Sequence, residues 1–70
     1  MTYLELLRRN AKLSQRALGE LARVDAGYIC TAEKYGFAHG VRLERMAQAL
    51  GWRDDPQKIL EQVDVEQVIA

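Results

Sequence analysis

The chain has 70 residues, of which 49% are hydrophobic, and its ten basic and ten acidic side chains cancel to a formal net charge of zero. This length allows one domain with one small core, and no apolar run approaches the roughly 20 residues that a membrane-spanning helix requires. The one cysteine, Cys30, excludes an internal disulfide and is typical of a reducing compartment, so we expect a cytoplasmic protein that does not contact a membrane.

The first expected helix covers about residues 2–11. Leu4, Leu7 and Ala11 recur there at the spacing of one helical face. The C-terminal end of this segment is basic, which suits the helix dipole, and its cations are Arg8, Arg9 and Lys12.

Residues 14–34 are expected to form two short helices joined by a tight turn. Ser14 can begin the first helix, because its hydroxyl accepts a hydrogen bond from a free amide of the first turn, and Asp25 can begin the second in the same way. Val24 is an apolar residue in an otherwise polar turn. The apolar face of the first helix would consist of Leu18, Leu21 and Ala22, and the second would turn Ile29 and Ala32 inward.

Two further helices are expected in the second half of the chain. The first runs from about residue 41 to 50 and ends before Gly51, which suits a left-handed residue after a helix. Its inner face would consist of Val41, Leu43, Met46, Ala47 and Leu50. Two aspartates followed by Pro56 predict a last short helix through about residue 62. We expect one domain over residues 1–63 and a C-terminal tail over 64–70, extended or frayed.

The spacing of these residues resembles that of the lambda-repressor-like (Cro-type, XRE) helix-turn-helix domain. The matching positions of the central unit are Ser14, Gln15, Leu18, Ala22, Val24, Ile29 and Glu33. The flanking matches are Leu4, Leu7, Arg8, Leu13 and the run 46–51. The resemblance covers roughly residues 4–52 and implies an all-α fold, a small bundle of about five helices around a central helix-turn-helix.

Three positions depart from the family pattern. Arg23 occupies a turn position where the family usually has Gly, so a left-handed conformation there costs roughly 1 kcal/mol. Gly19 replaces a small residue inside the second helix and keeps close packing possible. Leu21 stands where the family usually has an exposed polar residue. It is either an exposed surface residue with no particular role or part of a contact with another chain.

The resemblance implies a sequence-specific, double-stranded-DNA-binding regulator of transcription whose third helix, about residues 25–35, enters the major groove. Contacts to phosphates would come from Gln15, Arg16, Arg23 and Lys34. Contacts to base edges would come from Ala26, Gly27, Tyr28 and Thr31. The second set lacks the Arg, Lys, Asn and Gln side chains that discriminate bases best, so we expect weak sequence selectivity. The charge pattern is compatible with this, since residues 1–40 contain six basic and four acidic side chains and residues 41–70 contain four and six.

The resemblance also pairs Arg8 with Glu33, and we expect a partly buried ion pair between the first and third helices. A homodimer on a palindromic site would double the contacts of one small domain. Its interface is expected in the last helix and tail, at Ile59, Val63, Val65, Val68 and Ile69. The alternative is that Ile59 and Val63 only cap the core.

A second function remains open, because zero net charge, weak base-contacting residues and Leu21 also suit a helix-turn-helix fold used as a protein-interaction module. No nucleophile–base pair, carboxylate pair or metal cluster stands out, so an enzyme is not expected. Cys30 and His39 are too few for a zinc site, and no cofactor is expected.

Overall fold

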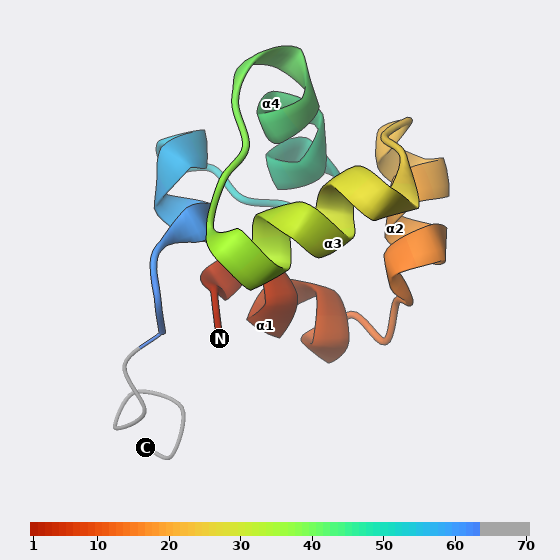
Figure 1. The fold of residues 1–70 in the computed structure, drawn as a ribbon, viewed down its shortest axis with the longest axis horizontal. Coiled ribbons are helices and arrows are strands. Elements are labelled where there is room, and N and C mark those ends of the chain that lie inside the picture. The colour runs from red at the N-terminus through yellow and green to blue at the C-terminus, as the bar shows by residue number, and fades with distance from the viewer. Residues whose placement is uncertain (64–70) are drawn as a thin grey trace.

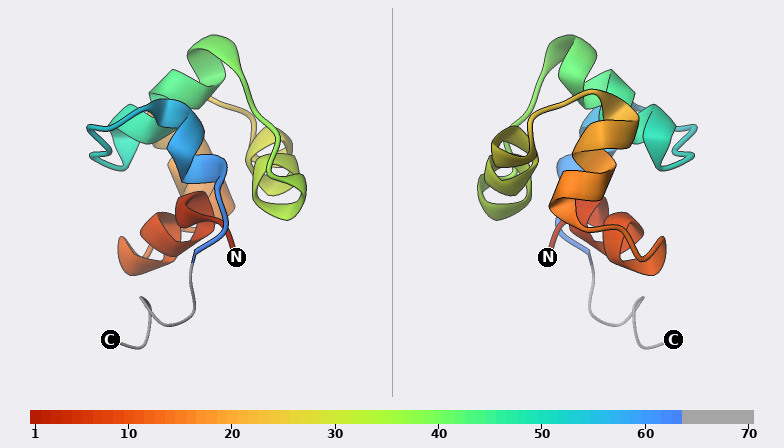
Figure 2. Two further views of the ribbon diagram at one scale, coloured as in Figure 1. Left: turned by 90° about the vertical axis from the view of Figure 1, so that its left-hand side faces the viewer. Right: turned by 90° about the vertical axis from the view of Figure 1, so that its right-hand side faces the viewer.

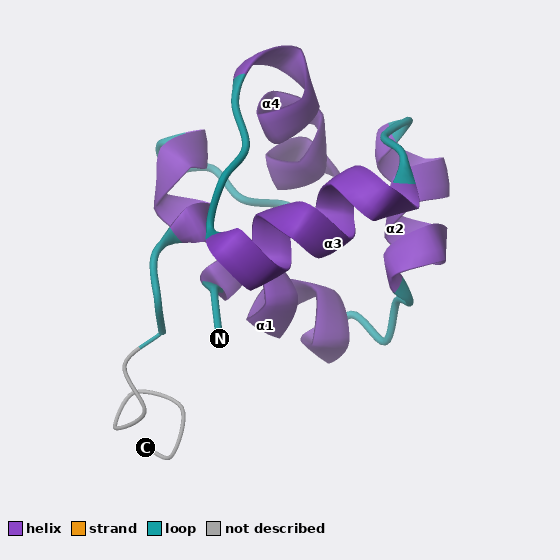
Figure 3. Cartoon of the chain, in the orientation of Figure 1, coloured by secondary structure: helices purple, strands orange, loops and turns teal. Residues whose placement is uncertain are grey.

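The computed structural model describes residues 1–63, which form four α-helices and one short 3₁₀ helix (Figures 1 and 3). In chain order these are α1 (Tyr3–Asn10), α2 (Gln15–Ala22), α3 (Ala26–Tyr35), α4 (Gly40–Ala49) and η1 (Pro56–Leu60). The expected all-α fold is therefore confirmed for the described residues, but with four α-helices in place of about five.

The last expected helix is a five-residue 3₁₀ helix because the backbone that follows it has other partners. The Tyr3 N–H donates to the Glu61 carbonyl oxygen at 3.0 Å, and the Val63 N–H donates to the Met1 carbonyl oxygen at 2.9 Å. These bonds form an isolated antiparallel bridge that holds the last described residues beside the N-terminus (Figure 2). An extended strand-like segment cannot also continue a helix, so η1 stops at Leu60.

Side-chain caps start the first three helices at the residues that local chemistry favours. The Ser14 hydroxyl accepts from the Ala17 N–H at 2.9 Å, and the Asp25 carboxylate accepts from the Gly27 N–H at 2.9 Å, as expected. Thr2 caps α1 from a fully buried position. Each cap satisfies an amide that has no partner within its own helix.

The turn between α2 and α3 combines a left-handed residue with a close backbone contact. Arg23 has φ 58° and ψ 46°, so the left-handed conformation expected at this position is present without a glycine. A Cβ atom added at Gly19 would lie 2.5 Å from the Val24 carbonyl oxygen. The glycine therefore lets the turn fold back onto α2, while Val24 is buried beneath it.

The core lies between the helices and is formed by Leu4, Leu18, Ala22, Val24, Ile29, Ala32, Ala38, Leu43, Met46, Ala47 and Ile59. Three residues of the expected apolar faces are instead exposed, namely Ala11, Leu21 and Val41. Ala11 is the C-cap residue of α1, beyond the helical stripe. Val41 precedes Leu43 by two residues, which is roughly 200° around a helix, so it faces away from the core.

Two residues of the expected dimer interface, Ile59 and Val63, are buried within the single chain. Ile59 is fully buried and Val63 is 9% exposed, so both side chains already belong to the interior of the single chain. The reason is that η1 packs against α1 and α4 and closes that side of the domain. Val65, Val68 and Ile69 lie outside the described residues.

Candidate functional site

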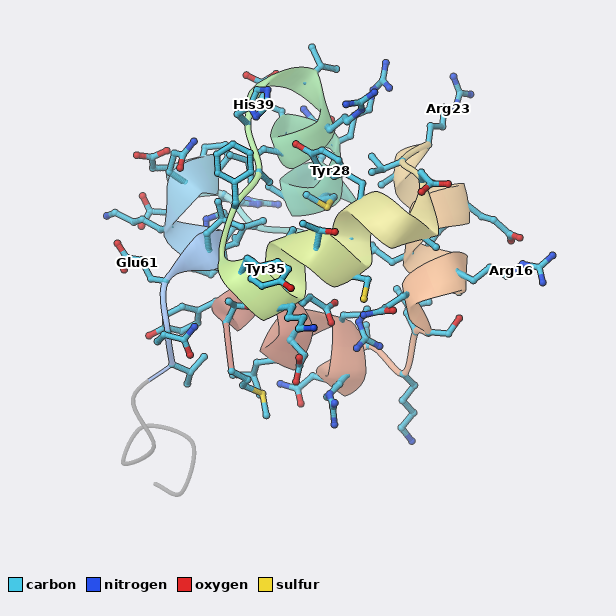
Figure 4. The ribbon with its side chains drawn as sticks, viewed as in Figure 1. Arg16, Arg23, Tyr28, Tyr35, His39 and Glu61 are labelled. Carbon is cyan, nitrogen blue, oxygen red and sulfur yellow. The ribbon has the colours of Figure 1, made fainter. Side chains whose placement is uncertain are left out.

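A wide groove runs along the outer side of α3, between its N-terminal half and the first turns of α4. Its volume is about 640 Å³, and α3 contributes Gly27, Tyr28 and Thr31 to its lining. Three exposed arginines also line it, namely Arg23, Arg42 and Arg45. Figure 4 shows Arg23 and Tyr28 toward the same end of the molecule, with Arg16 extending from α2 at the side.

Arg42 and Arg45 are functional candidates that the sequence reasoning did not name. Both project from the exposed side of α4, and their three-residue spacing places them on one helical face. That spacing was the available signal, but only the packing of α4 beside α3 brings them to the same groove as Gly27 and Thr31.

Tyr28 links α3 to the segment that begins α4. Its hydroxyl accepts a hydrogen bond from the His39 N–H at 3.0 Å and donates to the His39 carbonyl oxygen at 3.4 Å. The Arg42 guanidinium carbon lies 5.0 Å from the centre of the Tyr28 ring, a cation–π distance. Arg45 donates to the Arg23 carbonyl oxygen at 3.5 Å. These contacts restrain the arginines while leaving most of their N–H groups free.

The four residues expected to face bases do not share one surface. Gly27, Tyr28 and Thr31 line the groove beside α4, whereas Ala26 lines a second groove on the α2 side, of about 490 Å³. Arg16 belongs to this second groove, together with Arg23. Successive helical residues point roughly 100° apart, which separates Ala26 from Gly27.

The polar groups on the outer side of α3 are bonded within the protein. The Thr31 hydroxyl donates to the Gly27 carbonyl oxygen at 3.0 Å, and the Gly27 N–H donates to the Asp25 carboxylate. Asp25 is thus used as a cap, as the sequence suggested it would be.

The expected ion pair between Arg8 and Glu33 is present and nearly buried. Arg8 Nε lies 2.6 Å from Glu33 Oε2, and the two side chains are 11% and 3% exposed. Arg8 also donates to the Leu13 carbonyl oxygen at 2.8 Å. The hydrogen bonds to Glu33 raise the pKa of Arg8 above its ordinary value, against the opposing effect of burial. This pair fastens the N-terminal helix to α3.

Two residues expected at phosphates have other surroundings. Gln15 donates to Glu33 Oε1 at 3.1 Å and is only partly exposed, so its amide is part of the ion-pair network. Lys34 lies in the last turn of α3, outside both grooves, with its ammonium 5.2 Å from the centre of the Tyr35 ring.

Within residues 1–63, no cluster of three or more His, Cys, Asp and Glu side chains could hold a metal ion. No helix in this part of the chain is long and apolar enough to cross a membrane. Comparison of the chain with known protein families, curated proteins and solved structures found no match in any of the three.

Proposed function

We propose that this chain is a helix-turn-helix domain that binds double-stranded DNA and regulates transcription, with α3 in the major groove. The observation that carries the proposal is the placement of Arg23, Arg42 and Arg45 around the exposed N-terminal half of α3. Phosphate contacts are made mainly by such cations, and they set the position of a protein on the duplex.

The dimensions of α3 suit this arrangement. Its ten residues correspond to a rod of about 15 Å, and the major groove of about 12 Å width admits one helix. The arginines come from the turn before α3 and from α4 and gather along one groove beside the helix, where they could contact the phosphates that border an inserted helix. Arg16 and the second groove would extend the phosphate contacts along α2.

Zero net charge is compatible with DNA binding because the charges are unevenly distributed. Asp54, Asp55 and Glu61 lie at η1 and its flanks, and Figure 4 shows Glu61 on the side of the molecule opposite Arg16. Asp25, which lines the groove together with the arginines, is engaged as a helix cap. The groove lining still contains three arginines against one aspartate, so its formal charge is 3 − 1 = +2, compared with zero for the whole chain.

A salt titration of duplex binding tests the proposal. Affinity for any duplex should fall steeply as salt rises, and Arg42→Ala or Arg45→Ala should each reduce the slope of log K against log salt by about 1. Arg53→Ala is the matched control, because Arg53 is an exposed arginine between α4 and η1 that lines neither groove. Absence of binding at low salt would reject the proposal.

One observation favours a second candidate, a protein-interaction module. Leu21 is 63% exposed at the edge of a shallow groove of about 310 Å³ between α2 and α4. Exposed apolar groups beside a groove are typical of protein contacts. Two results together would favour this function. The chain would bind no duplex, and of the variants tested only Leu21→Ser would lose binding to a protein partner.

We further propose that two copies act together on DNA, since one small module buries only about 600–1,000 Å². With Ile59 and Val63 buried, the apolar residues left from the expected interface are Val65, Val68 and Ile69. Deletion of residues 64–70 should lower both the sedimenting mass and the affinity for a palindromic duplex. A monomeric mass for both forms at high concentration would exclude the dimer.

A further inference from the structure

The outer row of α3, defined here as Gly27 and Thr31, is where bases would be contacted if the proposed function is correct. The two residues are one helical turn apart, both are exposed, and both line the groove flanked by the arginines. They lie on the side of α3 opposite the buried Ile29 and Ala32. A base edge that meets the first turns of α3 would meet this row first.

The hydrogen-bond donors of the outer row are already engaged within the protein. The Thr31 hydroxyl donates its proton to the Gly27 carbonyl oxygen at 3.0 Å, and the Gly27 N–H donates to Asp25 Oδ2 at 2.9 Å. The neighbouring Tyr28 hydroxyl is bonded to the backbone of His39. What the row offers is carbon surface, namely the Cα of Gly27 and the Cγ2 methyl of Thr31, with the Thr31 oxygen left only as an acceptor.

The carbon surface of the outer row has one apolar counterpart in the major groove. Guanine presents two acceptors there, and its O6 and N7 need donors that the outer row lacks, while the Asp25 carboxylate beside Gly27 repels acceptor-rich edges further. The C5-methyl group of thymine is the apolar feature of the major-groove pattern, and a methylated cytosine has the same group. A Cβ atom at Gly27 would lie 2.8 Å from Asp25 Oδ2, so the glycine makes room for the capping carboxylate, and the methyl contact falls mainly on Thr31.

We propose that the outer row of α3 selects DNA by apolar contact with pyrimidine C5-methyl groups, while the arginines supply affinity without selectivity. The proposal rests on the DNA-binding function above and names how that site discriminates sequences. Each methyl contact should contribute a factor of roughly fourfold in affinity, which corresponds to about 0.8 kcal/mol for one buried methyl-sized group.

The first experiment varies the DNA. Duplexes enriched from a random pool by repeated binding are synthesised with thymine, with deoxyuridine in its place, or with 5-methylcytosine in place of cytosine. If thymine is the source of the methyl, deoxyuridine should weaken binding by roughly fourfold or more. If methylated cytosine is the source, affinity should rise with 5-methylcytosine while deoxyuridine has no effect.

The second experiment varies Thr31 and separates its methyl from its hydroxyl. Thr31→Ser removes the methyl and keeps the hydroxyl that bonds to Gly27, so the affinity difference between methylated and unmethylated duplexes should disappear. Thr31→Val keeps methyl groups and removes the hydroxyl, so that difference should persist. Both substitutions are at an exposed position, and circular dichroism verifies that the helices form.

The outcomes distinguish this inference from the proposed function. Salt-dependent binding that is identical for thymine, deoxyuridine and 5-methylcytosine duplexes overturns methyl selection and leaves DNA binding intact. Methyl selection would also be overturned if the enriched sites are rich in guanine and their affinity is lost in Arg42→Ala but unchanged in Thr31→Ser. That result would assign the base contacts to the arginines. Absence of binding to every duplex at low salt overturns both.

Discussion

Replacement of Glu33 by alanine should destabilise the protein more than any other substitution of an acidic residue in the described part of the chain. Glu33 is 3% exposed and accepts hydrogen bonds from Arg8 Nε, Arg8 Nη2 and Gln15 Nε2 at 2.6, 3.1 and 3.1 Å. Its loss leaves the largely buried Arg8 guanidinium without its carboxylate partner, which costs about 3–5 kcal/mol for a buried pair. The remaining bond to the Leu13 carbonyl and the 11% exposure of Arg8 favour the lower end, about 3 kcal/mol.

Such a loss is large for a chain of this size. At roughly 0.05–0.15 kcal/mol per residue, a 70-residue domain has a free energy of unfolding of about 3.5–10 kcal/mol. Urea unfolding followed by far-ultraviolet circular dichroism measures the change, provided that the slope with denaturant is unaltered. Glu20→Ala is the matched control, because Glu20 pairs with Arg16 at 3.7 Å with both side chains mostly exposed, and it should lose less than about 0.5 kcal/mol.

A double substitution tests the reason for the loss. Arg8→Met combined with Glu33→Leu removes both charges and fills the space with apolar atoms, so the double variant should be more stable than the sum of the two single effects predicts. Two results would refute the argument from an unpaired buried charge. One is that Glu33→Ala and Glu20→Ala lower the free energy of unfolding equally. The other is that the effect of the double variant equals the sum of the effects of the two single variants.

Three further predictions concern local backbone and charge. Gly19→Ala should lose about 1–3 kcal/mol of stability through its contact with the Val24 carbonyl, although alanine favours helices, and unchanged stability would contradict that contact. Arg23→Gly should relieve the left-handed strain and raise Tm by about 4–8 °C, whereas Arg23→Ala, which keeps the strain, should not. The backbone N–H of the next residue and the Lys58 ammonium lower the pKa of Asp54, so its contribution to stability is present above the ordinary pKa and is lost as pH falls through the lowered one. An NMR titration of Asp54 should therefore have a midpoint below the ordinary value, and Lys58→Met should raise it; a midpoint at or above the ordinary value would contradict the hydrogen bonds.

Local chemistry along the chain determined the helix starts and the turn. Ser14 and Asp25 cap their helices because a short oxygen-bearing side chain satisfies amides only a few residues away. The left-handed Arg23 and the close packing at Gly19 were expected from the resemblance of these positions to the helix-turn-helix family, and the structure has both features. The pairing of Arg8 with Glu33 was expected from the resemblance of their positions to a known family, and periodicity alone does not join residues so far apart.

The tertiary structure decided which residues share a surface, because that depends on the angles at which helices pack. It placed Arg42 and Arg45 of α4 beside Gly27 and Thr31 of α3, a juxtaposition that no local pattern encodes. It also placed Ala26 and Gly27 in different grooves although they are adjacent in sequence.

The end of the domain was likewise decided by long-range contacts. The sequence around Pro56 favours a helix start, but the backbone of Glu61 and Val63 bonds to that of Tyr3 and Met1, residues at the other end of the chain. A local pattern can name a helix start, since its partners lie within one turn. It cannot name a stop that depends on a distant segment, because that partner arrives only when the whole chain folds.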